Sequence, residues 1–172
     1  CTTNQDDRKR TNMRQYLGLD VAPLRIGWAV VSENAGVIKP VAHGTHLFDK
    51  KEWIVPSMRA EAMEDLHDAH KIEPAGIGME AVYVGINKLG SIRAAMALGQ
   101  IESICDYEWP DAEQKVLTAT QWRKVCGIPQ GGKVPVMEWA EAYTGETIDS
   151  QDDADALAIA YATAMWFTTD HE

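Results

Sequence analysis

Three runs rich in apolar and β-branched residues open the ordered part of the chain. They span 16–21, 25–31 and 37–47, and turn-forming residues separate them, with Ala22-Pro23 before the second run and Asn34-Ala35-Gly36 before the third. Strands joined by such short connections pair with antiparallel neighbours. The pattern therefore predicts a three-stranded antiparallel meander.

Helical and strand patterns alternate after the meander. A long helix is predicted over about 50–71, with Asp49 as its cap, and Pro56 indicates a late start or a kink. A short buried strand is predicted at 75–80. The remaining predicted elements are a helix capped by Ser91 and reaching about Tyr107, a strand at 113–117, a short helix capped by Thr118 or Thr120 and ending at Gly127, a helix at 134–143, and a last helix from Asp149 or Ser150 to about Phe167.

This order of elements predicts a mixed α/β fold built in layers. The chain has 172 residues, a length that fits one domain. We expect residues 1–14, which are mostly polar and include a basic triplet, to form a flexible N-terminal tail, and residues 15–172 to form a single domain.

The charge balance bears on the class of partner. The chain has 16 Lys and Arg against 26 Asp and Glu, for a net charge of −10. A basic surface is the usual sign of nucleic-acid binding, so the total argues against it. All the basic residues precede Val134, however, and much of the acid follows it. The distribution leaves room for a local basic patch.

Cysteine usage and hydropathy bear on the compartment. Cys1, Cys105 and Cys126 form no CxxC pair and no metal-ligand cluster, which is typical of reduced thiols in a reducing compartment. No apolar run reaches the roughly 18 residues that a membrane span needs. We expect a cytoplasmic protein that does not bind membranes.

Carboxylates stand at the ends of apolar elements, where burial makes them costly. Asp20 ends the first strand, Glu80 ends the strand at 75–80, and the run Asp152-Asp153-Ala154-Asp155 begins the last helix. Within that run the first and last Asp share a helix face, while Asp153 points elsewhere. Each alone has an ordinary explanation as a turn or cap residue. Together they predict one shared site, and divalent cations such as Mg²⁺ would relieve the repulsion there.

Four segments resemble the RuvC family of Holliday-junction resolvases. Residues 17–31 resemble that family's first hairpin, and Met79-Glu80-Ala81-Val82-Tyr83 resembles its second acidic segment. Leu98-Gly99-Gln100 and the run from Asp152 to Ala160 resemble the next helix and the closing helix. The resemblance covers nearly everything from Tyr16 to Phe167.

The resemblance implies an RNase H-like fold, with a five-stranded mixed sheet flanked by helices, in which an antiparallel trio is followed by parallel strands. It also implies a homodimer and a two-metal site. The implied catalytic and metal-binding acids are Asp20, Glu80, Asp152 and Asp155, with Asp153 as a spare, since a shift of one position within the acidic run stays open. The implied cofactor is two Mg²⁺ per site, with Mn²⁺ as a substitute.

The same resemblance implies contacts with DNA. Tyr83 occupies the place of an aromatic that stacks near the crossover, and Lys133 that of a phosphate-contacting lysine. Arg123 and Lys124 lie near a second family lysine, off by a residue or two. Independently of the resemblance, Lys88 and Arg93 form either a phosphate-binding edge or a solvated face. The departures are a longer segment between Glu80 and Leu98-Gly99-Gln100, the acidic total and the N-terminal extension.

The function that follows is an endodeoxyribonuclease that resolves Holliday junctions and related branched DNA. It would make paired, metal-dependent nicks that leave 5′-phosphate and 3′-hydroxyl ends, in the cytoplasm of a bacterium or of a virus-infected host. One alternative is an RNase H-like nuclease acting on replication forks, flaps or RNA–DNA hybrids. Another is a module that binds branched DNA without cutting it. Comparing cleavage of these substrates separates the alternatives.

Overall fold

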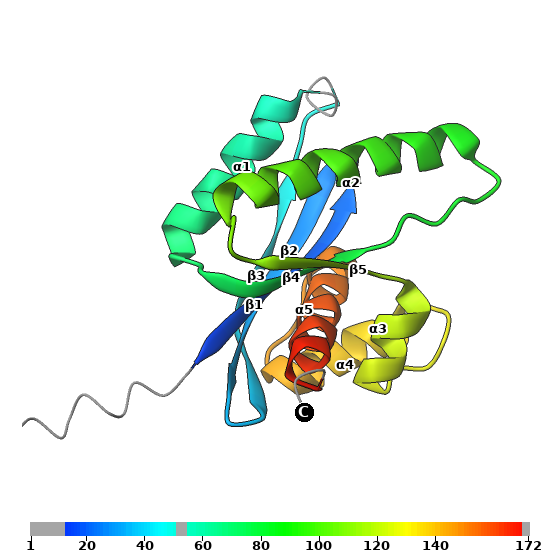
Figure 1. Cartoon of the computed structure of the whole chain (residues 1–172). Coiled ribbons are helices and arrows are strands. Elements are labelled where there is room, and N and C mark those ends of the chain that lie inside the picture. The colour runs from blue at the N-terminus through cyan, green and yellow to red at the C-terminus, as the bar shows by residue number, and fades with distance from the viewer. Residues whose placement is uncertain (1–12, 51–54, 170–172) are drawn as a thin grey trace, which may run out of the picture.

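The computed structural model describes residues 13–50 and 55–169 (Figure 1). The N-terminal tail, apart from Met13 and Arg14, lies outside the described residues, and the first strand already begins at Arg14. The elements are β1 (Arg14–Ala22), β2 (Arg25–Asn34), β3 (Val37–Leu47), α1 (Pro56–His70), β4 (Pro74–Glu80), α2 (Lys88–Glu108), β5 (Glu113–Leu117), α3 (Ala119–Cys126), α4 (Val134–Thr144) and α5 (Gln151–Thr169).

One five-stranded sheet organises these elements, in the order β3-β2-β1-β4-β5. The pairs β1–β2 and β2–β3 are antiparallel, whereas β4 runs parallel to both β1 and β5. The predicted meander and mixed sheet are therefore confirmed. Pro40 is accommodated by a bulge, since Val30 pairs with Ala42 but Val31 pairs with Pro40, which leaves Val41 extra.

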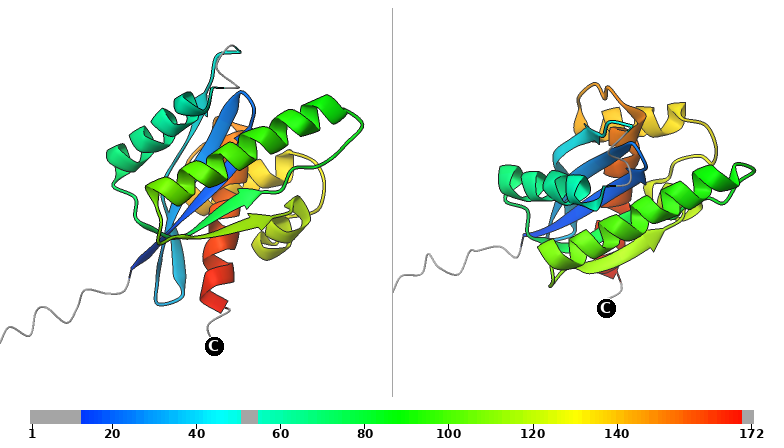
Figure 2. Two further views of the ribbon diagram at one scale, coloured as in Figure 1. Left: turned by 45° about the horizontal axis from the view of Figure 1, so that its top comes forward. Right: turned by 90° about the horizontal axis from the view of Figure 1, so that it is seen from above.

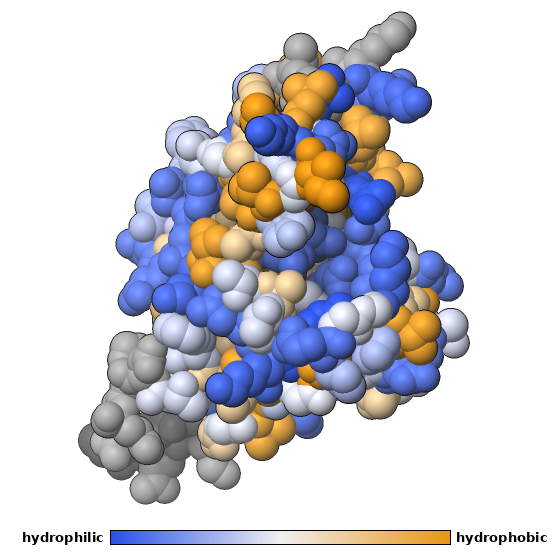
Figure 3. All heavy atoms as spheres, turned by 90° about the vertical axis from the view of Figure 1, so that its right-hand side faces the viewer, coloured by the Kyte–Doolittle hydropathy of each residue, from blue (hydrophilic) through white to orange (hydrophobic). Residues whose placement is uncertain are grey.

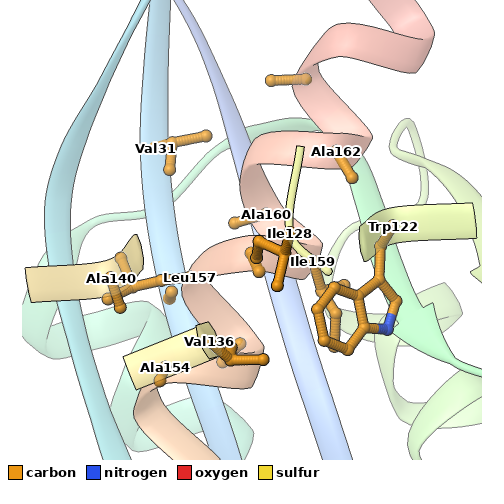
Figure 4. Close-up of a cluster of buried hydrophobic side chains, with 14 of the residues drawn as sticks. Val31, Trp122, Ile128, Val136, Ala140, Ala154, Leu157, Ile159, Ala160 and Ala162 are labelled. Atoms are coloured by element: carbon orange, nitrogen blue, oxygen red, sulfur yellow. The ribbon is translucent and has the colours of Figure 1, made fainter. Parts of the chain in front are cut away.

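Helices cover both faces of the sheet. Helices α1 and α2 lie on one face, and α3, α4 and α5 lie on the other (Figures 1 and 2). Each face has its own apolar core. The core on the α1–α2 side contains large side chains such as Met63, Ile77 and Ile101, and the core on the α5 side is rich in alanine (Figure 4). No helix in the described part of the chain is long and apolar enough to cross a bilayer.

Glycines in three neighbouring strands allow α5 to lie directly on the sheet. A Cβ atom added at Gly18 of β1 would collide with the backbone nitrogen of Ala160, and one at Gly27 of β2 would collide with the carbonyl oxygen of Asp152. Gly78 of β4 lies under the same helix. The sequence of these strands therefore fixes where the N-terminus of α5 sits.

Two predicted helix caps are wrong. Asp49 does not cap the first helix, which begins at Pro56 rather than near residue 50. The late start that Pro56 indicates is confirmed, since proline is favoured in a first helical turn. Residues 51–54 of that prediction lie outside the described residues. Helix α2 begins at Lys88, and its cap is Asn87, whose side chain accepts from the Gly90 N–H. Ser91 lies inside the helix.

The later helix starts agree better with the sequence. Thr118 caps α3 in a capping box with Gln121, which decides between the two threonines proposed. Ser150 caps α5, since its Oγ accepts from the Asp153 N–H at 3.1 Å. Gly127 ends α3, as the sequence predicts, and Gly145 ends α4, both with positive φ.

Candidate active site

Asp20 and Glu80 are brought together by the parallel pairing of β1 and β4. Leu19 pairs with Met79, so the next residue on each strand lies beside the other. Side chains alternate along a strand, which places both carboxylates on the same face as Gly18, the face that α5 covers. The two acids therefore meet at the carboxyl ends of neighbouring strands, beneath the start of α5.

Asp152 and Asp155 reach the same place from α5. Asp20 pairs with Gly27 across the β1–β2 ladder, and the backbone of Asp152 lies directly on Gly27. Asp155 follows three residues later and thus shares a helix face with Asp152. Three separate segments of the chain therefore deliver carboxylates to one site.

The pKa values of the strand acids record this convergence. Burial raises the pKa of Asp20 to about 8, and the charges of Glu80, Asp155 and Asp152 add to the rise. Burial also raises the pKa of Glu80 to about 7, with Asp155 as the next cause. The pKa of Asp155 is raised chiefly by burial. In the protein without bound cations, ionisation of this cluster is therefore unfavourable.

Cationic and amide groups partly offset the negative charge. Arg25 Nε donates to Asp152 Oδ1 at 2.7 Å, and Gln151 Nε2 donates to Asp155 Oδ1 at 2.8 Å. Arg123 lowers the pKa of both Glu80 and Asp155, and Lys133 lowers that of Asp155. The structure therefore brings Arg123 and Lys133, both predicted to contact DNA, near the acids.

Arg123 has a definite structural task beside this charge effect. Its Nη1 donates to the carbonyl oxygens of Pro129 and Gly131, and its Nη2 donates to that of Gly132, at 2.8 to 3.2 Å. These bonds hold the glycine-rich loop that ends at Lys133. The position of Lys133 thus depends on Arg123.

Asp153 faces away from the cluster. Its carboxylate accepts a hydrogen bond from Thr45 Oγ1 and lies 3.5 Å from His43 Nδ1, both on β3. It is not among the groups that shift the pKa of Asp20. The geometry favours Asp152 over Asp153 as the member of the run that joins the site.

The donor set fits hard divalent cations. Among residues 13–50 and 55–169, no three His, Cys, Asp or Glu side chains form a ready-made metal site. The chemistry suits magnesium, since all four donors are carboxylates. Burial, and after it the charges of the neighbouring acids, raise the pKa of Asp20, and a bound cation would favour its ionised form. Away from this site, His67 lies against Glu108 and Trp109, and His70 packs on Trp28.

A pocket of about 500 Å³ opens over the strand acids, lined by Asp20, Glu80 and most of the segment that follows, including Tyr83 and Asn87. Tyr83 lines it with 86% of its surface exposed. Figure 3 shows the side of the molecule that carries this segment, where apolar groups lie above a hydrophilic area. The pocket gives an extended ligand access to the acids.

The other basic residues predicted to contact DNA lie farther out. Lys88 and Lys124 are exposed, and neither is among the groups that shift the pKa of the carboxylates. Arg93 lies on α2 and lines a neighbouring pocket. The structure therefore does not bring these three to the acids themselves.

Sequence reasoning missed several partners of the acids, above all Arg25 and Gln151. A signal for Arg25 was present, because it follows the Ala22-Pro23 turn and therefore had to pair beside the end of the strand that carries Asp20. For Thr45 and His43, which hold Asp153, the chain offers no local signal.

Comparisons with known proteins extend this picture. No protein-family model matches the chain. RuvC of Rickettsia akari, named a crossover junction endodeoxyribonuclease, is 28% identical over 148 residues, which cover 84% of this chain and 93% of the relative. RuvC of Rickettsia prowazekii is likewise 28% identical over 149 residues.

Solved structures agree with the sequence relatives. The structure of Thermus thermophilus RuvC in complex with a Holliday junction substrate superposes with a TM-score of 0.72 at 17% identity, covering 90% of this chain and 95% of that one. The chain is thus similar to RuvC resolvases in sequence and in fold. The yeast mitochondrial Holliday junction resolvase Ydc2 matches with a TM-score of 0.61 at 17% identity, over 90% of this chain and 79% of that one. The RuvC-like fold implied by the sequence resemblance is thereby confirmed.

Proposed function

We propose that the protein is a structure-selective endodeoxyribonuclease that resolves Holliday junctions and related branched DNA by paired nicks. The observation that carries the proposal is the convergence of Asp20, Glu80, Asp152 and Asp155 from three segments of a RuvC-like chain. Burying four carboxylates together does not stabilise the fold, because ionising them there is unfavourable. Divalent cations bound between them, as in a nuclease active site, would offset that cost.

Asp20, Glu80, Asp152 and Asp155 would hold the metal, and Mg²⁺ suits their all-carboxylate chemistry. When bound, a pair of divalent cations supplies Lewis-acid activation of a phosphodiester and of the attacking water. The chain's part is to hold the four oxygen donors on a rigid sheet and helix. Gln151 orients Asp155, and Arg25 orients Asp152, through the hydrogen bonds described above.

Lys133 is the proposed contact to the phosphate that is cut. It lies close enough to lower the pKa of Asp155, and its ammonium group would offset negative charge that builds up on the phosphate oxygens. Arg123 positions it by holding the loop carbonyls. Cleavage through attack on the phosphorus with departure of the 3′ oxygen leaves 5′-phosphate and 3′-hydroxyl ends.

Tyr83 is the proposed contact to bases. Its ring is exposed at the rim of the pocket that contains Asp20 and Glu80. An unpaired base at a crossover would stack on such a ring, at a gain of roughly 1–3 kcal/mol. Lys88, Arg93 and Lys124 would then contact backbone phosphates around the site.

Pairing of the nicks requires two copies of the chain. The outward face of α2 carries Leu89, Ile92 and Met96, all exposed, and the open position Gly99 continues the same face. Exposed apolar side chains at helical spacing are typical of a surface that a partner covers. We propose that α2 packs on its symmetry mate in a C₂ homodimer, which would present two equivalent sites to the junction.

The test is cleavage of a synthetic four-way junction with Mg²⁺, with nicks mapped on all four strands. We expect symmetric nicks on two opposing strands, with little cutting of linear duplex, flaps or hybrids. The variant Asp20→Asn should bind the junction and leave it intact. Preferential cutting of flaps or RNA–DNA hybrids would instead support the alternative nuclease.

A further inference from the structure

A second pocket, of about 580 Å³, adjoins the acidic one and has the opposite charge. It is lined by the turn from Ala22 to Arg25 together with Lys50, Gly90 and Arg93. Its charged lining residues among those described are all basic. We call it the Arg25 pocket. On a chain with a net charge of −10, the grouping of three basic side chains around one pocket requires an explanation.

The two pockets are continuous along the chain and in space. The acidic pocket is lined by Asp20 and Val21, and the Arg25 pocket begins at the next residue, Ala22. Gly90 lines both. An extended ligand bound in the acidic pocket could therefore continue directly into the Arg25 pocket.

The start of α2 adds to the positive potential. The helix has 21 residues, begins at Lys88, and has no acidic residue in its first turn. Gly90 lies in that first turn, so the positive end of the helix dipole borders the Arg25 pocket. Helix termini of this kind favour phosphate groups when cationic side chains accompany them.

Arg25 connects the two pockets chemically. Its Nε bonds to Asp152, whereas half of its side chain, 51%, is exposed. A guanidinium carries five N–H donors, of which this bond uses one. The residue is therefore able to hold an acid of the cluster and a phosphate at the same time.

We propose that the Arg25 pocket binds a backbone phosphate of the DNA strand that is cut, next to the phosphate at the acidic site. The inference rests on the proposed nuclease function and adds Arg25 and Lys50 to its DNA contacts. An acidic protein must hold DNA through local contacts of this sort, because its overall field repels the strand. Phosphate contacts fix the register of the strand, which decides which phosphodiester meets Lys133.

The first test measures junction binding across salt concentrations, with every protein carrying Asp20→Asn so that the DNA stays uncut. Each phosphate contact contributes about 0.9 to the slope of log K against log salt concentration. The double variant Arg25→Gln, Lys50→Gln should therefore lose about 0.9 from the slope, the share of one phosphate, and Lys50→Gln alone should lose less than the double variant. Lys39→Gln, an exposed lysine on β3 opposite Ser32, removes the same charge at the far end of the sheet and should leave the slope unchanged. An unchanged slope in the double variant overturns the proposal.

The second test locates the phosphate. Single neutral methylphosphonates are placed along the junction strands, and binding by the Asp20→Asn protein is compared with and without the two Gln substitutions. We expect one position near the cut at which neutralisation weakens binding about tenfold, the scale of one charge-assisted hydrogen bond, and has no further effect in the Gln variant. Equal losses in both proteins at every position contradict the pocket. Failure of the Asp20→Asn protein to bind junctions contradicts the proposed function itself.

Discussion

The two faces of the sheet are packed by different means. On the α5 face, strand glycines meet a helix whose buried residues are mostly alanine, so backbone touches backbone. On the other face, large side chains such as Met63 and Ile101 separate α1 and α2 from the strands. Close packing of small residues leaves α5 little freedom to shift against the sheet. Its outer side is also covered by α3 and α4 (Figure 1). The rigid face carries the four acids, and the other face carries the exposed surface of α2.

The largest expected effect on stability comes from adding a side chain between β1 and α5. Gly18→Val should cost more than about 3 kcal/mol of folding free energy, because overpacking against backbone has no flexible neighbour to give way. Urea unfolding measures the loss. Gly99→Ala on α2 is the matched control, since nothing lies within 4 Å of its new methyl group, and it should be neutral or slightly stabilising. Equal stability of the two variants would show that α5 is not tightly seated.

Asn substitutions within the acidic run test which aspartate belongs to the active site. Asp152→Asn should reduce junction cleavage by at least about 10–100-fold, the range seen when groups around a metal are altered. Asp153→Asn should leave cleavage nearly intact and cost about 1–2 kcal/mol of stability, because its carboxylate bonds to Thr45. Single-turnover cleavage and thermal unfolding measure the two effects. The reverse ranking would make Asp153 the ligand.

A charge on the open face of α2 tests the other side of the comparison. Met96→Glu should dissociate the proposed dimer while the monomer keeps its fold, because the side chain is 49% exposed and contributes little to the core. Sedimentation velocity reports the mass, and circular dichroism the fold. Val37→Glu, at the exposed end of β3, is the control that should stay dimeric. A wild-type protein that is monomeric at all concentrations rules out the α2 interface.

A further test of the clustered acids is the pH dependence of the metal-free protein. The pKa of Asp20 rises from 3.8 to about 8 on folding and that of Glu80 from 4.5 to about 7, so the folded state binds protons more tightly than the unfolded state. The free energy of unfolding should therefore fall as pH rises from about 4 to 8. Chemical denaturation in EDTA at pH 5 and pH 8 measures it. Asp20→Asn should flatten the profile, and Mg²⁺ should restore stability at pH 8; a profile that rises over this window would contradict the clustering of the acids.

Much of this arrangement was accessible from the sequence because it depends on local pattern. Apolar strand runs followed by Asp20 and Glu80 predict acids at strand ends. Helical spacing places Asp152 and Asp155 on one face, but it left a shift to Asp153 open. The start of α2 was not accessible, since both Asn87 and Ser91 are good caps and tertiary packing selects between them. The turn at Ala22-Pro23 indicated that Arg25 lies near the end of β1, but its bond to Asp152 had no local signal, because the two residues are 127 positions apart in the chain.

The central claim is that Asp20, Glu80, Asp152 and Asp155 hold cations in common, and anomalous diffraction from crystals soaked in Mn²⁺ tests it most directly. The account predicts Mn²⁺ peaks among these carboxylates in the wild type, and their loss in crystals of Asp20→Asn. Strong peaks elsewhere, for instance between Asp153 and His43, with none at Asp20, would contradict it.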